Sequence, residues 1–259
     1  MTRSSRFPEC FKSGKLGHTL QSVTLIALMS FAGNAMASVT TYSGQDDGAP
    51  TTGPFPNSSA AQTTFKTAAA AYGSLNTLTF EGLPTGFGPF TTMGVNVGIT
   101  GANYGPSYSG LTTTTSGNVY GFNTTPGGDE FLGTSGDTTT FTFSSPTHSF
   151  GLWLTGLQTI FTASLPITFN DGTLETELPP IDVNGGAQFF GFTDTSAFSS
   201  VTIADVKSSN GVDDGWGLDD VTYNGTSVVT GPTPEPSSLL LLGTGALAIA
   251  GTLRRRLGF

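Results

Sequence analysis

The sequence predicts an all-β protein, a two-sheet β-sandwich of the jelly-roll type that carries one short helix near its N-terminus. The first observation is composition: the central part of the chain is dense in Thr, Ser, Gly and Phe and poor in Leu, Lys and Glu. Such a composition favours half-buried strands joined by tight turns. The second observation is that apolar and polar residues alternate in many short segments.

The segments with this alternation are residues 78–80, 139–143, 149–154, 165–169, 188–192, 201–204 and 218–223. Turn residues separate them. Asn170-Asp171-Gly172 predicts a hairpin between 166–169 and 173–176, because these residues tolerate the positive φ of a primed turn. Asn184-Gly185-Gly186 predicts a second turn of the same kind. Between residues 82 and 118 only 93–100 has a strand pattern, so we expect long loops there.

One helix is predicted at residues 57–72. Alanine is abundant there, and Phe65, Ala68, Ala69 and Tyr72 share one face. Asn57 or Ser58 is the expected N-cap, and the glycine at position 73 is expected to end the helix. We therefore expect a short helix lying against the sandwich.

Residues 1–37 are typical of a Sec signal peptide. Arg3, Arg6, Lys12 and Lys15 precede an apolar stretch at 23–32, and Ala35-Met36-Ala37 fits an A-x-A cleavage site. Cleavage there leaves a domain at 38–230 without cysteine, because Cys10 is removed with the signal. Disulfides cannot stabilise such a domain, so packing, strand pairing or a bound ion must do so.

The C-terminal end has a second targeting pattern. Residues 231–238 form a Pro-rich linker that contains Pro234-Glu235-Pro236, and 239–259 form an apolar helix followed by Arg254-Arg255-Arg256. The apolar run is short for a bilayer core, and the arginines favour the cytoplasmic side. These residues resemble the PEP-CTERM sorting signal of Gram-negative bacteria that make extracellular polysaccharide. The resemblance implies transient anchoring in the inner membrane and cleavage by an exosortase. The alternative is a simple single-pass anchor.

The predicted mature domain is strongly acidic. Its basic residues are Lys66 and Lys207, against sixteen Asp and Glu residues between 38 and 231. A charge balance of this sign repels nucleic acid, so we expect no nucleic-acid partner. Acidic clusters such as Asp219-Asp220 would be stabilised by Ca²⁺, which prefers carboxylate and carbonyl oxygens.

Two short motifs predict where a calcium ion would bind. Phe80-Glu81-Gly82 and Leu218-Asp219-Asp220-Val221 resemble motifs on the first and last strands of MAM and carbohydrate-binding jelly-roll modules. The resemblance implies one structural Ca²⁺ held by Glu81 and Asp220, with Asp219, Asp46 or Asp47 as further ligands. Adjacent residues of a regular strand point to opposite faces, so both aspartates reach one ion only if the strand bulges. The alternative is that these carboxylates lie at solvated strand ends.

Over residues 38–223, including Gln45-Asp46-Asp47-Gly48-Ala49, the chain is similar to exported PEP-CTERM β-sandwich proteins of unassigned role. Aromatic residues in loops can bind glycans. Trp216, Tyr104 and Tyr108 are the candidates, with Tyr120 in the same region, although core packing is the expected role of Trp216 and Trp153.

The sequence does not favour an enzyme. His148 is the one histidine of the predicted mature chain, and no G-x-S-x-G element accompanies it. The first expectation is a structural or interaction protein of the cell surface or extracellular matrix, associated with exopolysaccharide. The alternatives are a calcium-stabilised, lectin-like module and a carboxylate-dependent polysaccharide hydrolase.

Overall fold

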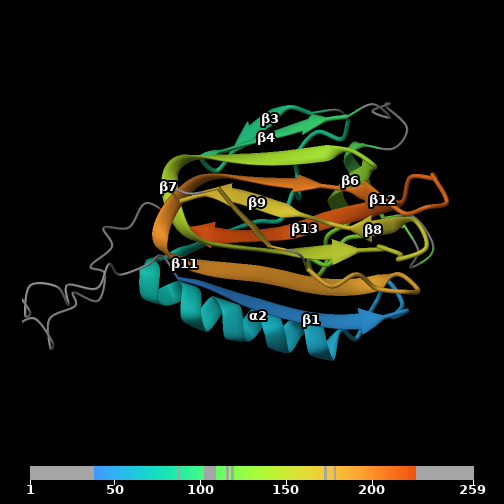
Figure 1. The fold of residues 1–259 in the computed structure, drawn as a ribbon, viewed down its shortest axis with the longest axis horizontal. Helices are drawn as coiled ribbons and strands as arrows, with labels where there is room; N and C mark the ends of the chain where they lie inside the picture. Colours follow the sequence, from blue (N-terminus) through green and yellow to red (C-terminus); the bar gives the residue numbers. More distant parts are fainter. Residues whose placement is uncertain are drawn as a thin grey trace, which may run out of the picture. The chain divides into compact units, whose positions relative to one another are not determined.

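The computed structural model describes residues 38–86, 88–101, 109–114, 117, 120–171, 174–177 and 179–225. Most of these residues belong to one large antiparallel sheet that folds over on itself into two layers (Figure 1). The predicted signal peptide, the Pro-rich linker and the apolar tail lie outside the described residues. Within the described part of the chain, no helix is long and apolar enough to cross a bilayer.

Two long strands create the two layers. β7 (Thr138–Thr155) and β11 (Gly186–Ala204) pair antiparallel along most of their length, from Ala187 opposite Thr155 to Ala204 opposite Thr138. Their register shifts between Thr193 and Ser200, and both ribbons curve sharply at one end of the molecule (Figure 1). Bulges of this kind bend a strand pair. Each long strand therefore contributes one half to each layer.

The remaining strands extend the two layers. The first layer contains β1 (Val39–Asp47), β2 (Leu75–Leu78), β5 (Gly110–Thr113), β6 (Glu130–Ser135) and β13 (Gly215–Asn224), together with the start of β11 and the end of β7. The second contains β3 (Phe90–Thr92), β4 (Val95–Thr100), β9 (Ile167–Asn170) and β10 (Leu174–Glu177), together with the start of β7 and the end of β11. A separate short pair is formed by β8 (Thr162–Ser164) and β12 (Val206–Lys207).

Strict alternation along the central strands divides their side chains between two cores. Phe150, Leu152 and Leu154 of β7 face the core between the layers, whereas Trp153 faces a smaller core beneath the helix. Phe190 and Phe192 of β11 alternate with Phe189 in the same way. The main core is rich in phenylalanine, and the rings of Phe169 and Phe192 stack with centroids 4.3 Å apart. Aromatic packing across the two layers therefore takes the place of disulfides.

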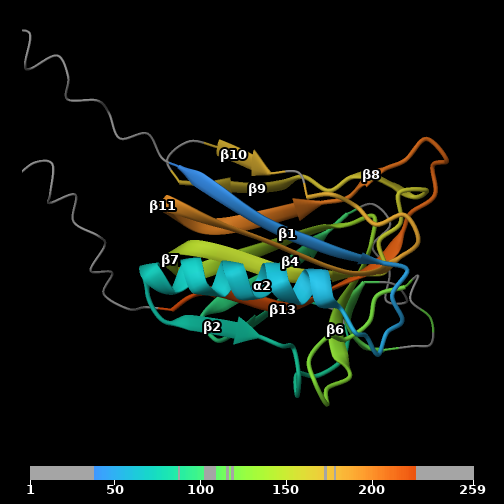
Figure 2. The same ribbon diagram turned by 90° about the horizontal axis from the view of Figure 1, so that it is seen from below.

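Helix α2 (Pro56–Ala69) continues into a 3-10 turn at Ala70–Tyr72 and lies across the outer face of the first layer (Figure 2). The predicted N-cap is wrong, because the cap position is Phe55 and Pro56 begins the helix. The Asp46 carboxylate of β1 instead accepts hydrogen bonds from the backbone N–H groups of Asn57 (3.1 Å) and Ser58 (2.9 Å). A side chain from a neighbouring strand thus does the work of a local cap.

The predicted C-terminal end of the helix is confirmed. Gly73 has φ 138°, a backbone angle that residues with a Cβ atom rarely adopt. Asn224 at the end of β13 donates its amide N–H to the carbonyl of Ala69 (3.0 Å), so the last strand of the domain holds the last turn of the helix.

Two glycines form the part of the sheet against which the helix packs. Gly151 of β7 and Gly191 of β11 are direct partners across the strands. A Cβ built on Gly151 would lie 2.7 Å from Phe65 and 2.8 Å from Phe189, and one on Gly191 would lie 2.9 Å from Phe65. Phe65 is fully buried there. The absence of side chains at this pair lets the helix approach the sheet.

The strand predictions are largely confirmed. The segments 139–143 and 149–154 are parts of β7, and 188–192 and 201–204 are parts of β11. β9 and β10 pair antiparallel, with Leu174 opposite Asn170, as predicted for two strands of a hairpin. β1, β6 and the short strands β3, β5, β8 and β12 were not predicted, and β3 and β5 shorten the loops expected at 82–118. Of the predicted segment 78–80, only Leu78 lies in a strand, at the end of β2. The two-layer arrangement fits a β-sandwich, and the jelly-roll topology stays a prediction.

We expect Gly151→Ala to destabilise the protein by about 1–3 kcal/mol, because the added methyl group must displace the rings of Phe65 and Phe189. Urea unfolding of the two proteins measures the difference. Gly98→Ala in β4 is the matched control, since a Cβ there meets nothing within 4 Å. Equal stability of Gly151→Ala and Gly98→Ala would contradict the role of the glycine pair.

Candidate functional site

Two adjacent aspartates of β13 reach the same loop because the strand bulges between them. The register between β13 and β7 shifts between Asp219 and Thr222, and Asp220 has φ 48°. In a regular strand the two side chains would point to opposite faces, so we expected both to reach one ligand only if the strand bulged. The side chains of both aspartates contact the Thr124–Thr125 segment.

Asp219 is fully buried, and only one of its two carboxylate oxygens has hydrogen-bond partners. Its Oδ2 accepts hydrogen bonds from the backbone N–H (2.6 Å) and hydroxyl (2.9 Å) of Thr124 and from the N–H of Thr125 (3.2 Å). Its Oδ1 has no hydrogen-bond partner. Asp220 uses Oδ1 to accept a hydrogen bond from the Thr125 hydroxyl (2.8 Å). A buried carboxylate oxygen without a partner is costly, so this atom is the natural contact point for a ligand.

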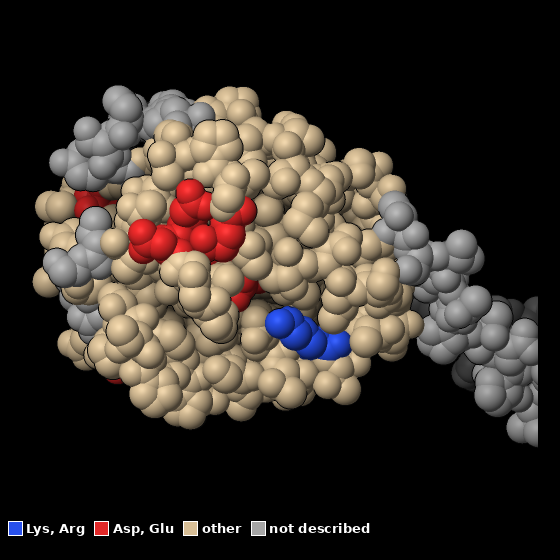
Figure 3. Space-filling model, turned by 180° about the vertical axis from the view of Figure 1, so that it is seen from behind, with Lys and Arg blue, Asp and Glu red and all other residues tan. Residues whose placement is uncertain are grey.

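Glu81 lies just beyond β2 and holds the other end of the same loop. Its carboxylate accepts hydrogen bonds from the N–H groups of Asp129 and Glu130 (both 3.1 Å to Oε1) and from the side-chain amide of Asn123. Glu130 in turn accepts the N–H of Gly82. The face seen from behind carries one compact acidic patch with a basic group close by (Figure 3). β2 pairs with β13 antiparallel, so the predicted approach of these two motifs is confirmed.

The electrostatics of this group reflect burial and crowding. Burial, and then the charge of Asp220, raises the pKa of Asp219 to about 7, although hydrogen bonds from Thr124 oppose the rise. Burial also raises the pKa of the Asp220 carboxyl, which the charge of Glu81 raises further and that of Lys66 lowers. Ionised Asp219 and Asp220 therefore repel each other unless a proton or a cation lies between them.

Asp46 and Asp47 have other roles. Asp46 caps α2, and Asp47 accepts hydrogen bonds from the N–H groups of Val183 (2.9 Å) and Asn184 (2.7 Å). Each of these aspartates therefore uses its carboxylate at a different part of the fold from Glu81. Across the residues the structure describes, no three His, Cys, Asp or Glu side chains come together in an arrangement suited to a metal.

The oxygen atoms that could hold Ca²⁺ at this site are therefore those of Asp219 and Asp220, supplemented by the hydroxyl oxygens of Thr124 and Thr125. The donor chemistry fits a hard cation, because every available ligand is an oxygen and one of them, Asp219 Oδ1, lacks a partner. Glu81 fits less well, since N–H groups already occupy its Oε1.

A groove of about 480 Å³ opens on the outer side of the same loop. Its polar lining consists of Thr51, Thr52, Thr114, Asn123, Thr124 and Thr125. Phe55 supplies an aromatic side chain, and Asp129 is the acidic residue of the lining. The segment 121–130 thus connects the buried carboxylates to an open surface. Sequence reasoning missed it, although Thr124-Thr125-Pro126-Gly127-Gly128 is a dense run of turn and hydroxyl residues.

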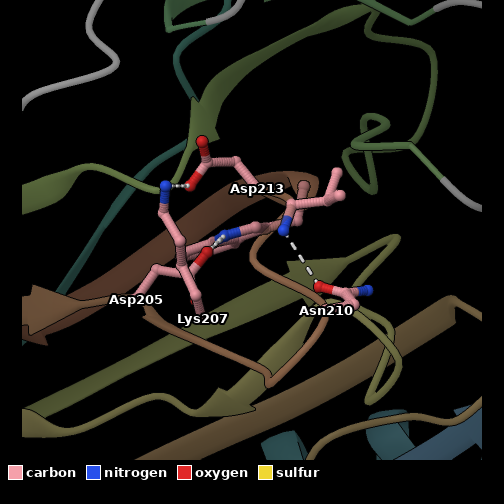
Figure 4. A network of polar contacts seen from close by, with 6 residues as sticks. Asp205, Lys207, Asn210 and Asp213 are labelled. Carbon is pink, nitrogen blue, oxygen red and sulfur yellow. Dashed lines mark hydrogen bonds and ion pairs between the residues drawn. The ribbon is translucent and has the colours of Figure 1, made fainter.

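Among the aromatic candidates, the two tryptophans are buried, two tyrosines lie outside the described residues, and Tyr120 is exposed. Trp216 is 2 % exposed, and its indole N–H donates to Asp205 (3.1 Å), so its ring cannot stack on a sugar. Figure 4 shows Asp205 in a network that includes the ion pair between Lys207 and Asp213 (2.6 Å). Trp153 is buried under α2. Tyr104 and Tyr108 lie outside the described residues, and Tyr120 is 59 % exposed.

His148 has a structural environment. Its ring stacks on Tyr72 of the 3-10 turn with centroids 5.0 Å apart, and its Nδ1 lies 3.0 Å from the carbonyl oxygen of Asp194. The contacts hold the end of the helix against the bend of β7 and β11.

The fold and this site define a β-rich, acidic domain with an exposed polar groove. Residues 232–256 match the PEP-CTERM protein-sorting motif. The motif indicates an exported protein that an exosortase processes, and it covers the predicted Pro234-Glu235-Pro236 and the three arginines. No curated protein and no solved structure matches the chain.

We expect the stability of the protein in the absence of metal to fall as the pH rises from about 4 to about 7. Asp219 keeps its proton in the folded state up to about pH 7 but loses it near pH 4 when unfolded, so its favourable contribution is complete below pH 4 and lost by pH 7. Burial raises the pKa of Asp182 to about 7 and of Asp214 to about 6, which adds to the effect.

Asp219→Asn should reduce this slope by up to about 1.4 kcal/mol per pH unit within that window. Urea unfolding at pH 5, 6 and 7 measures it, with Glu177→Gln in β10 as the control. An unchanged slope in Asp219→Asn would show that Asp219 is already ionised in the folded protein.

Proposed function

We propose that this protein acts outside the cell or at its surface as a binding and structural component that associates with exopolysaccharide, and that it is not an enzyme. The observation that supports this function best is the use of its carboxylates. Asp46, Asp47, Glu81 and Asp219 each accept backbone N–H groups and so hold loops and a helix end in place. Carboxylates that accept backbone N–H groups in this way stabilise the shape of the protein surface.

The groove supports binding over hydrolysis. Polysaccharide hydrolysis by two carboxylates requires a pair of acidic groups on either side of the scissile bond, roughly 5 to 10 Å apart. Among the described residues that line the groove, Asp129 is the acidic one. Hydroxyl and amide groups dominate the rest of the lining, and they are the groups that hydrogen-bond sugars.

The test of this proposal follows the protein through the cell. In the native host, wild-type chain should leave the inner membrane and cosediment with the polysaccharide matrix, whereas a variant with Pro234-Glu235-Pro236 replaced by three alanines should stay uncut in the inner membrane. Immunoblotting of fractions measures both. Glu175→Ala, outside the tail, is the control. Release of new reducing ends from the host polysaccharide by purified protein would contradict the non-enzymatic role.

A second candidate function is that of a calcium-stabilised carbohydrate-binding module. The observation that favours it is that the Asp219 carboxylate, whose Oδ1 has no hydrogen-bond partner, holds Thr124 and Thr125 through its Oδ2, and both threonines line the groove. A bound Ca²⁺ would neutralise Asp219 and Asp220. These residues would then hold the loop through the hydroxyls of Thr124 and Thr125, and the hydroxyls of Thr51 and Thr52 in the groove lining would face a sugar.

Thr52→Val should weaken glycan binding by about 3- to 10-fold, the loss expected for one hydrogen bond to an exposed hydroxyl of the groove lining. Binding of the host polysaccharide in the presence and absence of a calcium chelator measures it. Thr67→Val on the exposed side of α2 is the control, because that hydroxyl bonds within the helix to Thr63. Equal binding by both variants would exclude the groove.

A further inference from the structure

A second buried polar group lies where β1 ends beside the start of β11. Gln45 of β1 and Gln188 of β11 are direct partners across the two strands. Alternation along β11 places Gln188 on the same side as Phe190 and Phe192, which face the core between the layers. Asp182, in the segment that leads into β11, lies within hydrogen-bonding reach of the Gln45 side chain.

Two of these three side chains, Gln188 and Asp182, are buried with polar atoms that have no partner, whereas Gln45 is half-buried. Gln188 is 0 % exposed, and neither its amide oxygen nor its amide nitrogen has a hydrogen-bond partner. Asp182 is 2 % exposed, and its Oδ1 has none. Burying such atoms unsatisfied costs about 1–3 kcal/mol for each group, and more for a charged one. The polar atoms that remain are mainly oxygens, which points to a ligand that accepts oxygen donors.

The surrounding charge has the sign that a cation requires. Burial and the negative charges of Asp47 and Asp46 all disfavour the ionised form of Asp182, with burial the largest cause, and they raise its pKa to about 7. Hydrogen bonds also fix the backbone that follows Asp182. Asp47 accepts the N–H groups of the two residues that follow Asp182, and the N–H of Gly48 donates to the carbonyl of Gly185 (2.8 Å).

A proton is a poorer solution for this group than a cation. One proton on Asp182 neutralises that carboxyl but satisfies at most one further acceptor, and the amide of Gln188 still lacks a complete set of partners. A divalent cation accepts several oxygens at once and offsets the repulsion that Asp47 and Asp46 exert on an ionised Asp182.

We infer that Asp182, Gln188 and Gln45 form a binding site for a hard divalent cation such as Ca²⁺, with Asp47 contributing negative charge beside it. This site is separate from the Asp219–Asp220 group, because its residues come from β1, β11 and the segment between β10 and β11. It rests on neither the calcium-dependent function nor glycan binding. Its role is to join the first strand of the domain to the central pair of strands.

Calcium titration of the full chain, solubilised in detergent and stripped with chelator, tests the site. Calorimetry should show a binding event in the wild type that is lost in Asp182→Asn and kept in Asp219→Asn. If instead Asp219→Asn alone removes binding, the site at Asp182 is wrong and the calcium-stabilised module is supported. Binding unchanged in Asp182→Asn, or no calcium binding to the wild type, overturns the inference.

Gln188→Met provides a second measurement that does not depend on Asp182 folding normally as asparagine. Removing an unsatisfied amide from the core should raise the melting temperature of the metal-free chain. It should also abolish the rise of about 5 to 10 °C that calcium at 100 times its Kd gives the wild type. A lower metal-free melting temperature, or an undiminished calcium response, would show that the amide has partners of its own and overturn the inference.

Discussion

The structure depends on the pairing between β7 and β11. Each strand is long enough to cross both layers, and their shared bend converts one sheet into a sandwich. Every other strand of the two layers attaches to this pair directly or through one or two neighbours. The phenylalanine side chains that alternate along the two strands then fill the space between the layers and the space under α2. Without cysteine, the domain is stabilised by backbone pairing and aromatic packing.

The acidic residues have a second organising role. In a domain whose described basic side chains are those of Lys66 and Lys207, most carboxylates cannot form ion pairs. They accept backbone N–H groups instead, as Asp46 does at the start of α2, Asp47 at Val183 and Asn184, and Glu81 at Asp129 and Glu130. Hydrogen bonds to N–H groups favour the charged form of a carboxylate without a cation. Asp182 and Asp219 are buried, each has one oxygen without a hydrogen-bond partner, and they are the residues where a ligand is proposed.

Local patterns predicted the central features of the fold. Alternation identified both halves of β7 and β11, turn residues identified the hairpin after Asn170, and alanine with Gly73 identified the helix. β1 was missed because Thr40, Thr41, Ser43 and Gln45 give it little apolar character; it is a strand because β11 offers a partner far along the chain. The cap by Asp46 was missed for the same reason, since no local pattern shows which strand will lie beside a helix.

The candidate site was predicted in part. The pairing of β2 with β13 brings Glu81 near Asp220, as the two motifs implied, but Asp46 and Asp47 belong elsewhere. The bulge at Asp220 depends on a register shift against β7, which no single-strand pattern reveals. The loop from Asn123 to Glu130 completes the site through backbone N–H groups, which every sequence contains, together with the hydroxyls of Thr124 and Thr125 and the side-chain amide of Asn123.

The pairing of β1 with β11 has a consequence for how this exported chain folds. Val39 lies opposite Asp194, so the first strand to emerge during N-to-C translocation has no partner until most of the domain has followed. The pairing of β1 therefore forms late, and pairing between strands so far apart in the sequence is typical of slowly folding β proteins. β13 ends at Asn224, a few residues before the sorting motif begins at 232. Because β13 belongs to the first layer, the fold is completed only when the segment next to the sorting motif has been exported.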